Sequence, residues 1–317
     1  MRARHRLLRA SRFAWLFALT ACSHASSSGG PIDAGEPDAL APIPDAAIAD
    51  ATVDQEAPTR VRIVAANTTS GSSQSYDLPG IRIFQGLAPD IVLIQEFNYA
   101  GNDRRALVDA AFGKDFSFYV EPRAGGIPNG IVSRYPILES GVWADASTPD
   151  RAFAYARIDV PGAIDLWAVS VHLLTSGSSQ RNTEAAQLLG YIKATVPATA
   201  YLVVGGDFNT DTTGEQALLT LSAALTVSAP FPADQNGNAN TSINRNHPHD
   251  FVFAGSSLDA KKTPVTIGAV NFGAGLVFDS RVYTPLMDVA PVLVTDSAAT
   301  GMQHMPVVRD FVLGGPS

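Results

Sequence analysis

Four apolar runs of this sequence end in a side chain that can bind a metal ion or a phosphate group. The run at 61–66 is followed by Asn67, and the run at 91–95 by Glu96. The run at 166–171 ends at His172, and the run at 202–206 ends at Asp207, with Asn209 two residues later. Singly, each residue has an ordinary explanation, such as a turn, a helix cap or a carboxylate facing water. Because ligands of open α/β sheets lie beyond the carboxyl ends of the strands, the four endings together predict one shared site.

The elements that must position these residues alternate along the chain. Apolar, β-branched runs predict strands at 61–66, 91–95, 129–138, 151–173, 200–206, 249–254 and 306–313, with a hairpin inside 151–173 across its Pro-Gly turn. Helical spacing predicts helices at 80–89, 103–112, 181–196 and 213–225. Strands with helices between them predict the α/β class. We expect Gly205 and Gly206 to let the chain turn sharply, with Asp207 and Asn209 in a cleft and Phe208 in the core.

In this order, the motifs of the chain resemble the endonuclease/exonuclease/phosphatase superfamily, which includes deoxyribonuclease I, exonuclease III and the neutral sphingomyelinases. The matching pieces are Asn67, the QE pair at 95–96, SRYPI at 133–137, VHL at 171–173, GGDFN at 205–209, HDFVF at 249–253 and QHMPVV at 303–308. The resemblance extends from Arg60 almost to the C-terminus. It implies a four-layer α/β sandwich, with two mixed β-sheets face to face and helices outside.

The resemblance also implies roles in phosphoester hydrolysis. Asp207 would align or deprotonate the attacking water, and Asn209 would hold a phosphate oxygen. His304 would be the general acid or base, oriented by Asp250, because carboxylates commonly fix a catalytic imidazole. His172 would donate a hydrogen bond to the charge that develops on the phosphoryl group.

Glu96, helped by Asn67, is the expected metal site. Oxygen ligands suit Mg²⁺, Mn²⁺ or Ca²⁺, and the sequence has no cluster of cysteines that would suit zinc. One position departs from the family, since Gln303 stands where an aspartate usually precedes the last histidine. A neutral amide predicts weaker cation binding, unless Asp296 returns from the preceding loop to replace the missing charge.

Other hydrolase motifs are absent from the sequence. It contains no G-x-S-x-G, no P-loop, no G-x-G-x-x-G, and neither the Asp-x-His nor the Gly-Asn-His of calcineurin-like phosphoesterases. His247 and His249 could form a small metal motif, although histidines on a loop are more often solvated. An inactive surface binding domain of the same fold stays an alternative.

The substrate expected from these residues is a phosphodiester. We expect nucleic acid, cleaved by an endonuclease-like activity, and the alternative is a phospholipid or sphingomyelin phosphodiesterase. A lipid enzyme could expose an apolar hairpin at 268–278, where a buried strand pair is the main expectation. No obligate protein partner is implied.

The N-terminus resembles a bacterial lipoprotein signal peptide. Residues 1–12 contain five arginines and no acidic residue, and a short apolar run leads to Leu19-Thr20-Ala21-Cys22. The apolar run is too short to span a bilayer as a helix. Cys22, the only cysteine, is therefore the expected lipidation site, at the end of a signal peptide that occupies residues 1–22. This predicts export and a lipid anchor in the cell envelope, in the outer membrane or at the cell surface.

After residue 22, the distribution of charged residues separates the chain into two parts, 23–59 and 60–317. Residues 23–59 carry seven acidic residues and no Lys or Arg, lack aromatic residues, and predict a disordered Asp/Ala/Pro-rich tether. Of the total charge of −8, residues 60–317 carry −6 and form the expected catalytic domain. An acidic domain argues against a protein that coats nucleic acid by bulk charge, but it is compatible with a local basic cleft.

Overall fold

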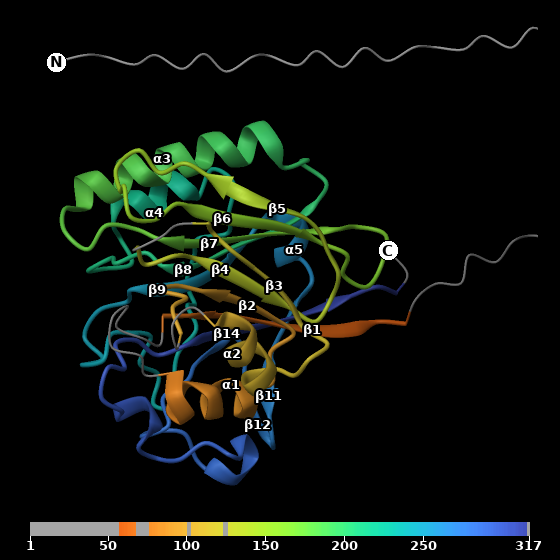
Figure 1. Cartoon of the computed structure of the whole chain (residues 1–317), viewed down its shortest axis with the longest axis vertical. Coiled ribbons are helices and arrows are strands. Elements are labelled where there is room, and N and C mark those ends of the chain that lie inside the picture. The colour runs from red at the N-terminus through yellow and green to blue at the C-terminus, as the bar shows by residue number, and fades with distance from the viewer. Residues whose placement is uncertain (1–56, 68–75, 100–102, 123–125, 316–317) are drawn as a thin grey trace, which may run out of the picture. The chain divides into compact units, whose positions relative to one another are not determined.

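Two β-sheets pack face to face, and helices lie on the outer side of each, as Figure 1 shows for the computed structural model of the chain. The structure describes residues 57–67, 76–99, 103–122 and 126–315, which belong to one compact unit. Cys22, the signal peptide and nearly all of the expected tether lie outside these residues. No helix in the described ranges is long and apolar enough to cross a membrane. The expected four-layer α/β sandwich is confirmed.

The first sheet has the strand order β10-β14-β1-β2-β4-β3, with β13 paired to β14. Its strands are β1 (Thr59–Ala66), β2 (Ile91–Ile94), β3 (Ser117–Val120), β4 (Gly130–Ser133), β10 (Lys262–Thr263), β13 (Leu276–Val277) and β14 (Val307–Leu313). Only the pairing of β1 with β2 is parallel among the strand pairs described in this sheet. β2 is buried along its whole length, which explains its continuous apolar run.

The second sheet has the strand order β5-β6-β7-β8-β9. Its strands are β5 (Ile137–Trp143), β6 (Phe153–Ile158), β7 (Leu166–His172), β8 (Tyr201–Asp207) and β9 (Asp250–Ala254). Side chains of β7 alternate between two clusters: Ala168 belongs to the core between the sheets, whereas Trp167 and Val169 belong to the core under α3. The predicted hairpin at 151–173 is confirmed by the antiparallel pairing of β6 with β7.

The helices of the outer layers are short, except for α3. They are α1 (Ile81–Leu87), α2 (Arg104–Ala111), α3 (Ser178–Thr195), α4 (Gln216–Leu221) and α5 (Ser256–Asp259), together with the π-helix η1 (Tyr76–Gly80) and the 3₁₀ helices η3 (Leu286–Val289) and η4 (Asp296–Ala298). α3 and α4 cover the second sheet, and α1 and α2 lie below the first (Figure 1). All four predicted helices are confirmed.

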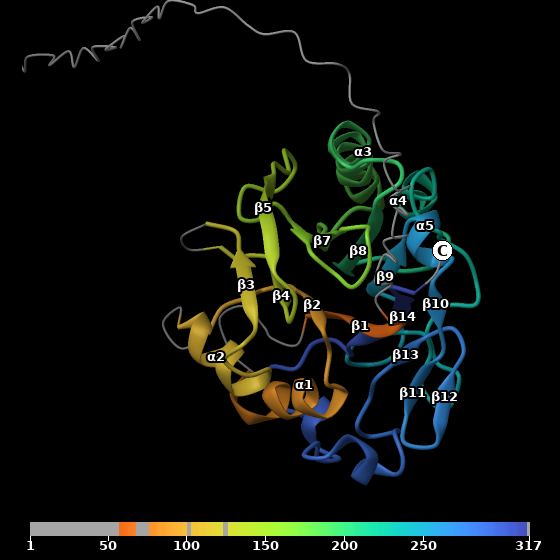
Figure 2. The ribbon, with the colours of Figure 1, turned by 90° about the vertical axis from the view of Figure 1, so that its right-hand side faces the viewer.

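The segment 268–278 forms two strands that pair with different neighbours. β12 (Val270–Phe272) forms a hairpin with β11 (Val265–Ile267), whereas Leu276 and Val277 form β13 on β14. Figure 2 shows the β11–β12 hairpin close to β10 and β13. Phe272 and Leu276 are buried, so this segment is not the exposed apolar hairpin of a lipid enzyme. The expected strands are present, but they do not pair with each other.

The two glycines of GGDFN lie inside β8, so the sharp turn predicted at these glycines is wrong. The chain turns at Asn209, which has a φ of 50°. A Cβ atom on Gly206 would lie 2.6 Å from Nε2 of Gln95, and one on Gly205 would lie 2.7 Å from Cδ1 of Leu93. Both neighbours follow or belong to β2 of the other sheet. The glycines therefore let the two sheets approach each other closely beside Asp207.

Candidate active site

The predicted strand ends meet at one place. His172 is in register with Asp207 across the parallel pair β7–β8, and Asp207 is in register with Asp250 across the antiparallel pair β8–β9. From the other sheet, Nδ2 of Asn67 donates a hydrogen bond to Oδ2 of Asp207 at 2.9 Å and lies 3.4 Å from Oε1 of Glu96. The residues at all four strand ends, together with Asp250, are therefore neighbours.

A hydrogen bond beneath the site ties the two sheets together. Nε2 of Gln95 donates to Oγ of Ser170 at 2.9 Å, and this hydroxyl donates to the carbonyl of Ile94 at 3.0 Å. Gln95 and Ser170 are both fully buried. Gln95 directly precedes Glu96, and Ser170 lies two residues before His172. The hydrogen bond between them therefore helps to fix the distance between the strand ends of the two sheets.

His304 lies between two carboxylates. Its Nδ1 is 2.9 Å from Oδ2 of Asp250 and 3.5 Å from Oδ2 of Asp207. Ligand atoms of these three buried residues lie within 4.8 Å of one another, so the group could hold a metal ion. An imidazolium at His304, however, already supplies the positive charge that the two carboxylates require.

The charges of this group shift each other's pKa. Burial lowers the pKa of His304, but Asp250 and Asp207 outweigh it and raise the pKa to about 9. Burial also raises the pKa of Asp207; the charge of His304 opposes this shift and Asp250 adds to it. His304 is therefore protonated at neutral pH, while Asp207 is a stronger base than an exposed aspartate. These are the properties of a proton donor and a proton acceptor.

His172 has a neighbour that the sequence analysis missed. Nη1 of Arg151 lies 3.1 Å from Nε2 of His172, and both side chains are buried. Burial, and then Arg151 and His304, lower the pKa of His172 well below its usual value. Because a guanidinium can only donate, Nε2 of the neutral ring is the acceptor and its proton is on Nδ1. Nothing local in the sequence marks Arg151, which lies two residues before the start of β6 and 21 residues from His172.

Asn209 fixes the turn that carries Asp207. Its backbone N–H donates to Oδ1 of Asp207 at 2.8 Å, and its Nδ2 donates to the carbonyl of Leu173 at 2.8 Å. The side-chain amide thus holds the turn to Leu173, which directly follows β7. Phe208, between the two residues, is fully buried against Phe251 and Phe253, as predicted.

Glu96 and Asn67 have the features of a cation site. Burial raises the pKa of Glu96 to about 7; a hydrogen bond from Asn67 opposes this shift and the charge of Asp207 adds to it. Oδ1 of Asn67 is buried and has no hydrogen-bond partner among the described residues. Glu96 also has a positive φ of 51°, a conformation that costs a non-glycine residue about 1 kcal/mol or more. A hard divalent cation would satisfy both the buried carboxylate and the unpaired amide oxygen.

Two further histidines extend from His304 towards solvent. The ring of His249 lies 5.2 Å from that of His304, and the ring of His247 lies 5.4 Å from that of His249. Nδ1 of His249 lies 3.0 Å from the carbonyl of Thr210, and the side chain of His247 is 41% exposed. They do not belong to the one group of potential metal ligands found among the described residues. We missed this stack because contact with a distant histidine leaves no local pattern.

Gln303 lies directly before His304 and is half-buried. Asp296 does not replace the charge that is missing at this position. Its carboxylate is buried in an ion pair with Arg82 of α1 and also accepts the backbone N–H of Leu293. Arg82 and Leu293 bind both carboxylate oxygens of Asp296, so the prediction that Asp296 could return to the site is wrong.

The comparisons with known proteins agree with this fold. A family model described as "Endonuclease/Exonuclease/phosphatase family" matches residues 81–274. No curated protein matches the chain. Among solved structures, an endonuclease/exonuclease/phosphatase from Beutenbergia cavernae is 18% identical with a TM-score of 0.54, over 81% of this chain and 72% of that chain.

Two other structures are similar over nearly their whole length. Truncated Caenorhabditis elegans TDP2 is 15% identical with a TM-score of 0.53, over 80% of this chain and 98% of that chain. An AP endonuclease from Archaeoglobus fulgidus is 16% identical with a TM-score of 0.51, over 79% of this chain and 99% of that chain. At these identities the likeness establishes the fold and leaves the substrate open.

Proposed function

Because the chain belongs to the endonuclease/exonuclease/phosphatase family, whose members are generally hydrolases, we propose that it is a divalent-metal-dependent phosphodiesterase that cleaves nucleic acid. One observation carries this proposal. The buried carboxylate of Asp207 accepts a hydrogen bond from Asn67 of the opposite sheet and lies 3.5 Å from Nδ1 of His304. Asp207, as the proton acceptor, thus lies next to His304, the proton donor, and is hydrogen-bonded to Asn67, whose amide lies beside Glu96.

The reaction follows from the protonation states of these side chains. A divalent cation held by Glu96 and Asn67 would neutralise charge on the phosphoryl oxygens. Asp207 accepts a proton from the attacking water as the oxygen of that water bonds to phosphorus. The bond between phosphorus and the leaving oxygen breaks, and His304 donates its Nε2 proton to that oxygen. Asp250 meanwhile holds Nδ1 of His304. Arg151 adds a fixed positive charge that suits an anionic diester.

The histidine stack supports nucleic acid as the substrate. His249 lies against His304, and the exposed ring of His247 continues the stack outward. Single-stranded nucleic acids bind proteins largely by stacking their bases on aromatic side chains, histidine among them. A base next to the scissile phosphate would find such a surface at His247.

A phospholipid phosphodiesterase is the second candidate, and a separate observation favours it. Met287, Leu293 and Val294 project from the segment before His304 and are 80%, 51% and 55% exposed. Leu293 and Val294 are consecutive in the sequence, and large apolar side chains exposed together are typical of surfaces that contact lipid or another protein. An enzyme held at a membrane would meet phospholipid first.

A substrate panel tests the proposed activity. Single-stranded DNA, duplex DNA, RNA and phospholipid vesicles are each incubated with the protein, once with Mg²⁺ and once with EDTA. We expect product from nucleic acid with Mg²⁺ and none with EDTA. If His247 stacks on bases, single-stranded DNA should give more product than duplex DNA. Product from vesicles alone would favour the second candidate. No product from any substrate would favour the inactive binding domain.

We also propose that the protein is a lipoprotein anchored in the cell envelope through Cys22. Replacing Cys22 by serine should move the protein from the membrane fraction to the soluble fraction, because two or more acyl chains are needed for stable anchoring. Fractionation and the mass of the N-terminal peptide measure the result, with Ser27→Ala in the same region as the control. Membrane association and lipid mass that survive in Cys22→Ser would contradict the anchor.

A further inference from the structure

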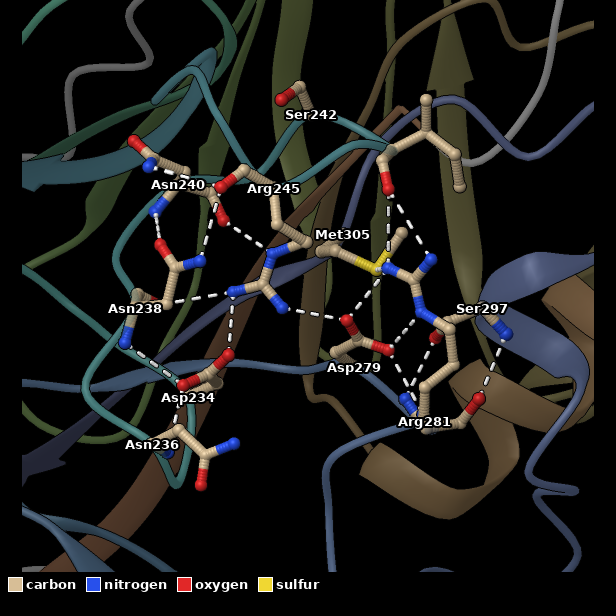
Figure 3. A network of polar contacts seen from close by, with 12 residues as sticks. Asp234, Asn236, Asn238, Asn240, Ser242, Arg245, Asp279, Arg281, Ser297 and Met305 are labelled. Carbon is tan, nitrogen blue, oxygen red and sulfur yellow. Dashed lines mark hydrogen bonds and ion pairs between the residues drawn. The ribbon is translucent and has the colours of Figure 1, made fainter.

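The loop at 234–247, between β8 and β9, folds around the guanidinium of Arg245 (Figure 3). This group donates to Oδ2 of Asp234 at 2.8 Å and to Oδ2 of Asp279 at 2.7 Å. It also donates to the carbonyls of Asn240 at 2.7 Å and of Asn238 at 3.1 Å. Three oxygens of the loop and one of Asp279 therefore surround one positive charge, as oxygens would surround a metal ion.

The loop itself is arranged to present those oxygens. Oδ1 of Asp234 accepts the backbone N–H groups of Asn236 and Asn238, both at 2.9 Å. The side-chain amides of Asn238 and Asn240 donate back to the carbonyl of Arg245, which has a positive φ of 57°. Arg245 is thus bonded through its side chain and its backbone to the same turn.

A second arginine closes the network from the other side. Asp279, which is 1% exposed, accepts Nε and Nη2 of Arg281 at 2.8 Å in addition to Arg245. Arg281 also donates to the carbonyl of Ile243. Hydrogen bonds and ion pairs from Arg281, Arg245 and the backbone lower the pKa of Asp279 despite its burial. Positive and negative side chains alternate along the network, which makes it stiff.

The same loop carries the groups that hold the proposed proton donor. The hydroxyl of Thr241 donates to Oδ2 of Asp250 at 2.6 Å and accepts the backbone N–H of Asp250 at 2.9 Å. The carbonyl of Thr241 accepts the N–H of Met305 at 2.7 Å, and Ser242 forms a β-bridge with His304. Both members of the Asp250–His304 pair are therefore held by two consecutive loop residues.

We propose that Arg245 is a positioning residue for the Asp250–His304 pair, acting through Thr241. It takes the place of a bound cation at the centre of the loop, and its loss would free the turn that aims the Thr241 hydroxyl at Asp250. This inference rests on the proposed function, because the pair is assigned there to proton donation. A lysine would supply the charge but could not reach all four oxygens with the geometry of the planar guanidinium.

The test measures hydrolysis by the whole chain at saturating Mg²⁺, with the nucleic-acid substrate of the panel. Arg245→Met should lower kcat on the order of 10- to 100-fold, because a small misplacement of a catalytic group costs about that much, and should leave KM within about twofold. Arg245→Lys should recover part of the loss. Thr241→Val should lower kcat similarly, and the double variant should cost no more than the worse single variant, because both changes remove one positioning path.

A matched control separates positioning from stability. Arg82→Met also leaves a buried aspartate without its arginine, since Asp296 is 1% exposed, but Arg82 has no bond to the loop. We expect this variant to lose thermal stability while kcat stays close to that of the wild type. A fall in kcat no larger for Arg245→Met than for Arg82→Met would overturn the proposal, as would independent, multiplying effects of Arg245 and Thr241.

A measurement without substrate keeps this inference apart from the proposed function. The Nδ1 proton of His304, held by Asp250, should give a protected, downfield resonance in the NMR spectrum of the protein. Arg245→Met and Thr241→Val should both shift or broaden it, and Arg82→Met should not. If the wild type hydrolyses nothing, the activity proposal fails and this resonance decides the positioning role. An unchanged resonance in Arg245→Met would refute that role.

Discussion

Replacing Asp207 by alanine should lower hydrolysis at saturating metal by about 10³-fold, because a positioned acid or base contributes roughly 10²- to 10⁴-fold. The side chain lies 1% exposed between Asn67, His172 and His304, so the variant loses the proton acceptor and one carboxylate of the charged group. Initial rates on the preferred substrate measure the loss. His304→Gln, which removes the proton donor, should cause a loss of similar size.

Asp165→Ala is the matched control for Asp207→Ala. Asp165 pairs with Arg157 at 2.7 Å beside the turn between β6 and β7 and is about one-third exposed. Its replacement should leave the rate within about twofold, since exposed ion pairs contribute roughly 1 kcal/mol or less to stability. Circular dichroism should show that both variants are folded. A rate for Asp207→Ala within tenfold of the wild type would remove Asp207 from the mechanism.

Replacing Glu96 by alanine should raise the Mg²⁺ concentration needed for half-maximal activity by about 100-fold or more. Even side chains that only support metal ligands contribute 10- to 100-fold to metal affinity, so loss of a charged ligand should cost at least as much. Removal of this buried carboxylate also takes away Oε1 of Glu96, which accepts a hydrogen bond from Nδ2 of Asn67 at 3.4 Å. Titration of activity with Mg²⁺, and calorimetry of Mg²⁺ binding without substrate, measure the change.

Glu139→Ala controls for the general loss of negative charge. Glu139, on β5, lies near Arg157, and its side chain is 45% exposed. Its removal should leave the titration of activity with Mg²⁺ unchanged. If Glu96→Ala binds Mg²⁺ as the wild type does, the cation site is elsewhere. The group of Asp207, Asp250 and His304 would then be its place, and His304 would be a ligand instead of a proton donor.

Local patterns in the sequence were sufficient to predict the four main helices, most of the strands and the strand ends, but not the short strands β3, β10 and β11. Apolar runs mark buried strands, and a polar residue after such a run stands out wherever it lies in the fold. Asn67 and Asp207 could therefore be picked out separately, although 140 residues separate them. Their mutual hydrogen bond could not be predicted from either run, because it depends on how the two sheets face each other.

Residues whose role depends on distant neighbours were missed or misread. Arg151 was missed, and His249 was considered only in a separate metal motif with His247, because their partners, His172 and His304, lie elsewhere in the sequence. Asp296 could be considered a substitute for the charge at Gln303 only because its ion pair with Arg82, 214 residues away, was unknown. Sequence distance therefore says little about which charge faces which.

The close approach of the sheets beside Asp207 has a consequence for how the protein tolerates mutation. Because an added Cβ at Gly205 would meet the side chain of Leu93, the thickness of the core sets the distance from Asn67 to Asp207. Replacement of a core residue beside Leu93 by a larger apolar residue would then alter the rate of the proposed reaction, although no group that contacts the substrate is changed. Variation at these interior positions is thus a heritable means of tuning the proposed activity, and selection on that activity should restrict side-chain volume there as well as chemistry at the site.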